Sequence, residues 1–183
     1  MRLVAGLAVA AIALLSSRMS AHSAGAALCD AYAKESAAKA QGVRDFACGY
    51  DLKDPRWTTN RKGHASWCRA TPEKAVADET ARRRGDMNLC QTCRAYADMA
   101  VEAAAENKKN KCRLTGPAWT ENKSDHFAWC MALRDNENAA GPDIAATYQT
   151  IATKIQTVIR QETVKRKIQI VQCQIVTRRE ARP

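Results

Sequence analysis

Eight cysteines, set out as two copies of one pattern, constrain this chain of 183 residues more than any other feature of its sequence. Each copy opens with Cys-x-x-Tyr-Ala, at Cys29 and again at Cys93, and has its next cysteine 19 residues later. Each copy then carries Pro-x-Trp-Thr-x-Asn, followed by His-x-x-Trp-Cys. Agreement in residue types this rare indicates a tandem repeat of one structural unit.

The repeat divides the chain into three predicted segments. Residues 1–23 form a predicted signal peptide, residues 24–90 a first four-cysteine repeat, and residues 91–183 a second repeat with an extended basic C-terminal segment. Arg2, an apolar run over 3–15 and the small residues after it are typical of a secretory signal, and the run is too short to span a bilayer. We therefore expect a periplasmic or secreted protein with no transmembrane span after signal removal.

Export changes the interpretation of the cysteines. In an oxidising compartment an even number of cysteines predicts disulfides, so we expect four. The eight candidates are Cys29, Cys48, Cys68, Cys90, Cys93, Cys112, Cys130 and Cys173. Two alternatives are a redox pair of Cys90 and Cys93 and a zinc site of four cysteines, which would need the reduced thiols that export disfavours.

Composition predicts an all-α fold. Strong helix formers fill residues 31–46 and 96–111, and aromatic residues make up only 5% of the chain. Thr71, Pro72 and Glu73 are typical of a helix start, and this helix is expected to fade near Gly85. The expected architecture is two tandem disulfide-stapled helical hairpins with a long basic C-terminal helix.

The spacing of the cysteines suggests a pairing. A separation of 19 residues on a helix corresponds to about 28 Å, so Cys29 and Cys48 lie at opposite ends of the first helix. If the return helix is antiparallel, Cys48 pairs with Cys68 and Cys29 with Cys90. By the same logic Cys112 pairs with Cys130 and Cys93 with Cys173. The nested pairing is a hypothesis, because eight cysteines allow about 105 connectivities.

The C-terminal segment carries two apolar stripes. The first has helical spacing, and the second resumes it in a shifted phase after Gln161. The first consists of Ile144, Tyr148, Ile151, Ile155 and Val158, and the second of Val164, Ile168, Val171 and Ile175. We favour one long helix with a phase break, but residues 168–176 are rich in β-branched side chains and could instead form an edge strand.

The motifs Cys-x-x-Tyr-Ala, Cys-Gly-Tyr, Pro-Arg-Trp and His-x-x-Trp-Cys resemble a cysteine-rich tandem repeat of small exported proteins from rhizobia and related alphaproteobacteria. The resemblance covers nearly all of the chain after the signal segment, and it implies a periplasmic or secreted protein with no assigned activity. Arg113 and Ala118 stand where the pattern has a glycine and an arginine. A site that needs both of those residues would be intact only in the first repeat.

The two Trp–His loops are the first candidate for recognition. Indole faces stack on sugar rings, while histidine and asparagine supply directed hydrogen bonds. The alternative is that these side chains form the small core of a stapled turn. The candidates are Trp57, Asn60, His64, Trp67, Trp119, Asn122, His126 and Trp129.

Basic residues are the second candidate. The chain has a formal net charge of +10, and more than half of it falls in the last 33 residues. The functional interpretation is attraction to an anionic surface, and the alternative is an ordinary solvated helix face. The anionic-surface candidates are Lys165, Arg166, Lys167, Arg178 and Arg179.

The sequence contains none of the common catalytic or nucleotide-binding motifs that we sought. We therefore expect no enzyme, no metal and no cofactor, and export argues against a nucleic-acid partner. The sequence predicts an exported binding or envelope-associated protein whose partner is a glycan, an anionic envelope polymer or another exported protein. The alternatives are a purely structural or partner-binding module with its Trp–His loops as core, and a thiol–disulfide redox protein using Cys90 and Cys93.

Overall fold

The computed structural model describes residues 23–135 and 143–180, and this part of the chain is helical apart from turns and loops. It contains α1 (Ala26–Asp45), α2 (Arg61–Arg69), α3 (Glu73–Lys109), α4 (Lys123–Asp135) and α5 (Ile144–Glu180). Two short 3-10 helices, η1 (Pro55–Trp57) and η2 (Pro117–Trp119), carry the Pro-x-Trp motifs. The predicted all-α, disulfide-stapled fold is confirmed. Most of the predicted signal peptide, residues 1–22, lies outside the described residues.

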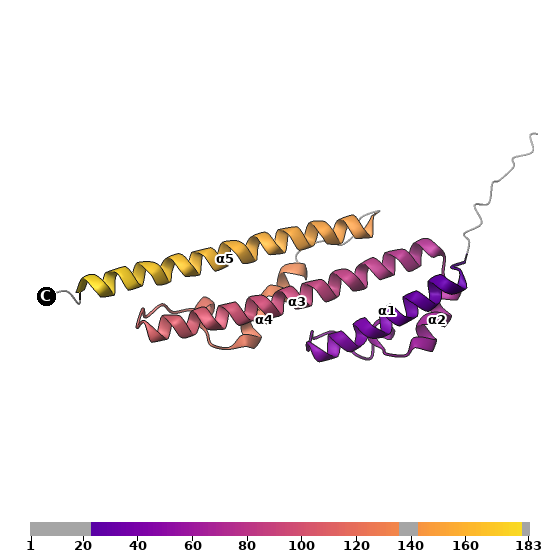
Figure 1. Cartoon of the computed structure of the whole chain (residues 1–183), viewed down its shortest axis with the longest axis horizontal. Coiled ribbons are helices and arrows are strands. Elements are labelled where there is room, and N and C mark those ends of the chain that lie inside the picture. The colour runs from indigo at the N-terminus through magenta and orange to yellow at the C-terminus, as the bar shows by residue number, and fades with distance from the viewer. Residues whose placement is uncertain (1–22, 136–142, 181–183) are drawn as a thin grey trace, which may run out of the picture.

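The three long helices run in the same direction, with α3 between α1 and α5 (Figure 1). Cys29 near the start of α1 packs near Val76 near the start of α3. Glu35, further along α1, pairs with Arg84, further along α3, so the two helices are parallel. The short helices α2 and α4 run in the opposite direction and return the chain to the start of the next long helix. Each repeat therefore consists of a long helix, a short return arm and a second long helix.

The two repeats share helix α3. The first repeat uses the N-terminal half of α3 as its last helix, and the second repeat uses the C-terminal half as its first. The predicted boundary between residues 90 and 91 falls inside α3. The prediction that the helix fades near Gly85 is wrong. Gly85 lies beneath the ring of Tyr148 from α5. Its lack of a side chain makes room for this ring, and the helix continues through Gly85.

The disulfides differ from the predicted pairing. The structure joins Cys29 to Cys68, Cys48 to Cys90, Cys93 to Cys130 and Cys112 to Cys173. The prediction of Cys48 with Cys68, Cys29 with Cys90, Cys112 with Cys130 and Cys93 with Cys173 is therefore wrong.

The reason for the error is the direction of the return helix. The segment between Cys48 and Cys68 already brings the chain back to the start of α1, because α2 lies antiparallel to α1. The helix after Cys68 must then run parallel to α1, and it carries Cys90 to the level of Cys48. Each disulfide closes a loop of 37 to 61 residues and contributes on the order of 3–4 kcal/mol to stability by the chain-entropy estimate. Four disulfides fit an oxidising, non-cytoplasmic location.

Helix α5 is continuous from Ile144 to Glu180, so residues 168–176 are helical and the strand alternative is excluded. Its first half buries Ile151, Ile155 and Ile159 against α3. The shifted phase after Gln161 has a structural explanation, because the second apolar stripe lies on the solvent side of the helix. Within the described residues, the helices are not long and apolar enough to cross a membrane.

We predict that peptide mapping without reductant finds four linked pairs, Cys29–Cys68, Cys48–Cys90, Cys93–Cys130 and Cys112–Cys173. The expected thiol count of the unfolded, unreduced protein is zero, because all eight cysteines are paired. Recovery of a Cys48–Cys68 peptide would contradict the parallel arrangement of α1 and α3.

Candidate functional site

The two predicted histidines hold the ends of the Trp-containing loops. His64 donates through Nε2 to the carbonyl oxygen of Thr58 at 2.8 Å, and its ring meets Tyr32 edge-on at a centroid distance of 6.2 Å. His126 repeats both contacts, with the carbonyl of Thr120 at 2.8 Å and the ring of Tyr96 at 6.2 Å. Both histidines are buried. Each histidine thus closes its own loop against the first helix of its repeat.

A buried arginine occupies the centre of each repeat. Arg83 and Arg166 are 4% and 5% exposed, and each donates to the carbonyl of the residue before the first tryptophan of its motif. The Arg83 guanidinium lies 5.7 Å from the ring centroids of both Tyr32 and Trp57. Arg166 lies similarly, 5.6 Å from Tyr96 and 5.9 Å from Trp119. Cation–π contacts of this kind offset part of the cost of burying a charge.

The role of these two arginines was not predicted from the sequence. Arg166 was expected on an anionic-surface patch, whereas the structure places it in the interior. Both stand at the same distance before the last cysteine of their repeat, Cys90 and Cys173. Aligning the second long helix of each repeat on its last cysteine would have identified both arginines.

The tryptophans divide into an inner and an outer set. Trp57 is 3% exposed and stacks on Tyr50 at 4.8 Å, and Trp119 is half-buried. The outer residues Trp67 and Trp129 are 42% and 40% exposed. Their indoles lie tilted against Tyr32 at 5.3 Å and Tyr96 at 5.1 Å, respectively. The outer tryptophans are therefore the two most accessible indoles of the repeats.

The two asparagines support the helices that follow them. The side-chain oxygen of Asn60 accepts from the backbone N–H of Gly63 at 3.1 Å and caps α2. The side-chain oxygen of Asn122 accepts from the backbone N–H of Ser124 at 3.0 Å, just before α4. Satisfying the free N–H groups at a helix start is a common role for asparagine.

The first repeat surrounds a cavity of about 400 Å³ that we call the repeat 1 pocket. Its lining combines the outer tryptophan with charged and polar side chains from α1, the η1 loop, α2 and α3. The lining includes Tyr32, Asp54, Arg56, Asn60, His64, Trp67, Glu79 and Arg83. Glu79 is central, because its Oε1 accepts from Arg56 Nε at 2.8 Å and lies 3.1 Å from Arg83 Nε.

The second repeat keeps the buried cluster but not all of these polar groups. Ala118 takes the place of Arg56, and Gly116 takes the place of Asp54. Tyr96, Arg166 and Trp129 are retained and make equivalent contacts. The buried tyrosine, arginine and tryptophan are therefore common to both repeats, whereas Arg56 and Asp54 belong to the first repeat alone.

A second polar cluster joins the two repeats. The carboxylate of Asp86 on α3 is 1% exposed and pairs with Arg134 of α4 at 2.9 Å. Tyr148 of α5 donates to Asp86 Oδ1 at 3.3 Å, and Tyr50 donates to the backbone carbonyl of Asp86 at 3.2 Å. Burial raises the pKa of Asp86, while Arg134 opposes that rise. The cluster connects the η1 loop, α4 and α5 to one point on α3.

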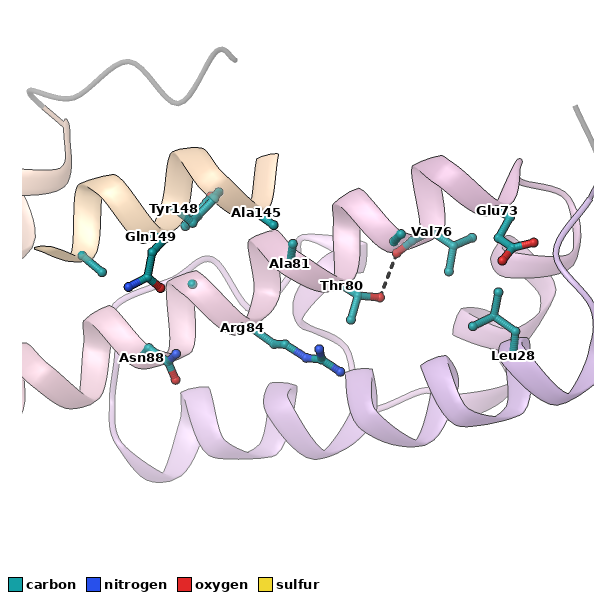
Figure 2. A pocket seen from close by; sticks show the side chains of 13 residues that line it. Leu28, Glu73, Val76, Thr80, Ala81, Arg84, Asn88, Ala145, Tyr148 and Gln149 are labelled. Carbon is teal, nitrogen blue, oxygen red and sulfur yellow. Dashed lines mark hydrogen bonds between the residues drawn. The ribbon is translucent and has the colours of Figure 1, made fainter. Parts of the chain in front are cut away.

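An open groove of about 520 Å³ lies along α3 between α1 and the first turns of α5. Figure 2 shows Tyr148 and Ala145 on the α5 side and Leu28 on the α1 side. Arg84 reaches across towards α1, where it binds Glu35 through two bonds of 2.6 and 2.7 Å. This ion pair lowers the pKa of Glu35. The lining is mainly small or apolar, and its charged members are Glu73 and Arg84.

The outer face of α5 is formed by Val164, Ile168, Val171 and Ile175, which are 47–53% exposed. The buried residues Arg166 and Ile170 face α3 from the opposite side of the helix. At about 100° per residue, Lys165 and Arg179 flank the outer face on one side, and Lys167 and Arg178 flank it on the other. Four of the five anionic-surface candidates therefore border an apolar stripe.

The structure does not join Cys90 to Cys93. Each is fully buried and bonded to a different partner, Cys48 and Cys130. The redox alternative that used these two thiols as a pair therefore has no support in the geometry. Among the described residues, no three histidine, cysteine, aspartate or glutamate side chains are placed to hold a metal ion.

Comparison with protein-family models, curated proteins and solved structures found no match to this chain. The resemblance to exported repeat proteins therefore stays a prediction.

We predict that the free energy of unfolding decreases as the pH falls below 6.5, the ordinary pKa of histidine. Burial, assisted by Arg83, lowers the pKa of His64 in the folded state, although its bond to Thr58 opposes the shift. Between the lowered and the ordinary pKa the unfolded chain binds more protons, so stability rises with pH in this window and is lost as the pH falls through it.

Denaturant unfolding at a series of pH values tests this prediction. The variant His64→Gln should flatten the pH dependence in this window, whereas the exposed substitution Lys62→Gln should leave it unchanged. An unaltered slope in His64→Gln would contradict a lowered pKa at this residue.

We predict that Gly85→Ala lowers the free energy of unfolding by about 1–3 kcal/mol, the usual cost of overpacking. An added Cβ would overlap the Tyr148 ring, and moving this ring breaks its bond to Asp86. The effect opposes the gain of about 1 kcal/mol that alanine normally gives over glycine in a helix. Gly25→Ala is the control, because nothing lies within 4 Å of its Cβ position. A more stable Gly85→Ala protein would contradict the packing of α5 on α3.

Proposed function

We propose that the protein is an exported, non-enzymatic binding protein that recognises a neutral saccharide in the repeat 1 pocket. The single observation that carries the proposal is the composition of this pocket. It combines an exposed indole, Trp67, with a set of charged groups held in place by one another. Export is supported by the four disulfides and by the signal-like pattern of residues 1–23.

The exposed indole suits one face of a sugar ring. Pyranose rings present C–H groups on their faces, and these groups pack against aromatic rings. Trp67 is 42% exposed at the pocket, and the ring of Tyr32, which also lines the pocket, lies tilted against it at 5.3 Å. A rigid aromatic wall of this kind binds at low cost in conformational entropy.

The polar groups suit the hydroxyl groups of a sugar. Arg56 and Arg83 supply donors, while Asp54 and Glu79 supply acceptors, so the formal charges of these four side chains sum to zero. Ion pairs with Glu79 hold the Arg56 and Arg83 side chains in place before a ligand arrives. Asp54 also accepts from the backbone N–H of Arg56 at 2.8 Å. A balanced and preorganised set favours a neutral polyhydroxylated ligand over an ion.

The second repeat shows that two of these polar groups, Arg56 and Asp54, exceed what the fold requires. It builds the same Tyr–His–Trp–Arg cluster with Ala118 and Gly116 in place of Arg56 and Asp54. The pocket volume of the first repeat falls within the range of small-molecule sites, about 300–1,000 Å³.

We predict that Trp67→Ala weakens saccharide binding at least about tenfold, because it removes the stacking surface. Isothermal titration calorimetry of the mature protein with maltotriose, cellotriose and triacetylchitotriose provides the measurement. Trp129→Ala is the matched control, because it removes the equivalent indole from the repeat without Arg56, and binding should be unchanged. Arg56→Ala should also weaken binding, and it should fold because the second repeat carries alanine at this position.

Three results would overturn the proposal. They are no binding of any neutral trisaccharide, equal losses in Trp67→Ala and Trp129→Ala, or binding of trigalacturonate alone with strong salt dependence. Circular dichroism and a zero thiol count show whether each variant has folded.

A further inference from the structure

We infer that the outer face of α5 docks an amphipathic helix from a partner protein, and that acidic residues flank the apolar stripe of this partner helix. The inference goes beyond the proposed saccharide site, whose lining residues come from α1, the η1 loop, α2 and the N-terminal half of α3. It rests on the internal repeat, the spacing of the exposed side chains and the charge around them.

The internal repeat shows where helices of this fold receive a neighbour. Aligning Arg83 with Arg166, and Cys90 with Cys173, places Ile168 at the position of Gly85. In the first repeat this position lies beneath the Tyr148 ring, so α3 is covered there by α5. Among the described residues no helix covers the equivalent position on α5, and Ile168 is 50% exposed.

The exposed side chains have the spacing of a helix–helix contact. Val164, Ile168, Val171 and Ile175 are separated by four, three and four residues, which is the spacing of the apolar seam in a coiled coil. All four are β-branched and lie on the side of α5 opposite to its buried residues. A contiguous apolar face of this kind on an exported protein marks an interaction surface.

The charges select the partner. Residues 163–179 contain five basic and no acidic side chains, and four of the basic ones flank the outer face. The fifth, Arg166, is buried. A second copy docking through the same face would place lysine and arginine against lysine and arginine, which is unfavourable. An acidic helix instead pairs with both flanks while its apolar stripe covers the seam.

The geometry favours a helix over a lipid surface. In the first repeat the equivalent face receives a helix, and the stripe on α5 extends over only about three turns. A bilayer surface rich in anionic lipid is the competing occupant, and the experiment below separates the two.

The test uses the mature protein and two designed helical peptides of four heptads. Both peptides carry leucine at the a and d positions, and one has glutamate but the other lysine at the e and g positions. Fluorescence anisotropy should detect binding of the glutamate peptide and not of the lysine peptide. Ile168→Ser combined with Val171→Ser should weaken binding at least about tenfold.

Matched variants control for exposure and charge. Leu52→Ser with Val176→Ser changes two equally exposed apolar residues away from the stripe and should bind like the wild type. Lys165→Glu with Lys167→Glu should weaken binding, whereas Lys34→Glu with Lys62→Glu makes the same charge change elsewhere and should leave affinity within about twofold, since distant exposed charges are largely screened.

Four outcomes would overturn the inference. They are no binding of the glutamate peptide, equal binding of both peptides, a dimer in analytical ultracentrifugation that the Ile168→Ser and Val171→Ser changes dissociate, or exclusive binding to vesicles of phosphatidylglycerol. Retained trisaccharide binding in the Ile168→Ser, Val171→Ser protein shows that the saccharide site is independent of the outer face of α5.

Discussion

Each repeat is organised around one buried guanidinium. Burying an arginine is costly unless its charge and its N–H groups are satisfied. Arg83 and Arg166 meet part of this requirement with the same partners, a backbone carbonyl before a tryptophan and the faces of a tyrosine and a tryptophan. The buried Nε atom of each makes no hydrogen bond to the described residues. These partners come from two segments of each repeat, the first long helix and the η turn, while the arginine itself stands on the second long helix. The arginine thereby fixes the position of the turn between two parallel helices, and the disulfides lock the arrangement at its ends.

This constraint explains why the repeat preserves so many uncommon residues. Tyr32 and Tyr96 supply a ring face to the arginine and a support for the outer tryptophan. His64 and His126 hold the loop that presents the carbonyl group. The retained motif is therefore largely structural, and the two repeats differ in the side chains around it. The polar groups of the repeat 1 pocket and the apolar face of α5 are two such differences.

Composition and local pattern were sufficient to predict two features of the fold. The helical class follows from alanine-rich segments, and the four disulfides follow from an even number of cysteines in a chain with a predicted signal peptide. The connectivity could not be derived in the same way, because it depends on whether the short segment after Cys48 extends the hairpin or reverses the chain. Spacing alone is compatible with both. The shifted phase of Val164 and its neighbours was visible in the sequence. That these side chains face solvent could not be predicted, because it depends on the buried residues Arg166 and Ile170 on the other side of the helix.

Because α3 belongs to both repeats, the molecule has no joint between them. From Val76, which lies level with Cys29, to Cys93, which is the equivalent cysteine, this helix rises about 25 Å. The continuous helix therefore sets the spacing between the repeat 1 pocket and the outer face of α5. If both surfaces bind as proposed, a partner that engages both must match this length.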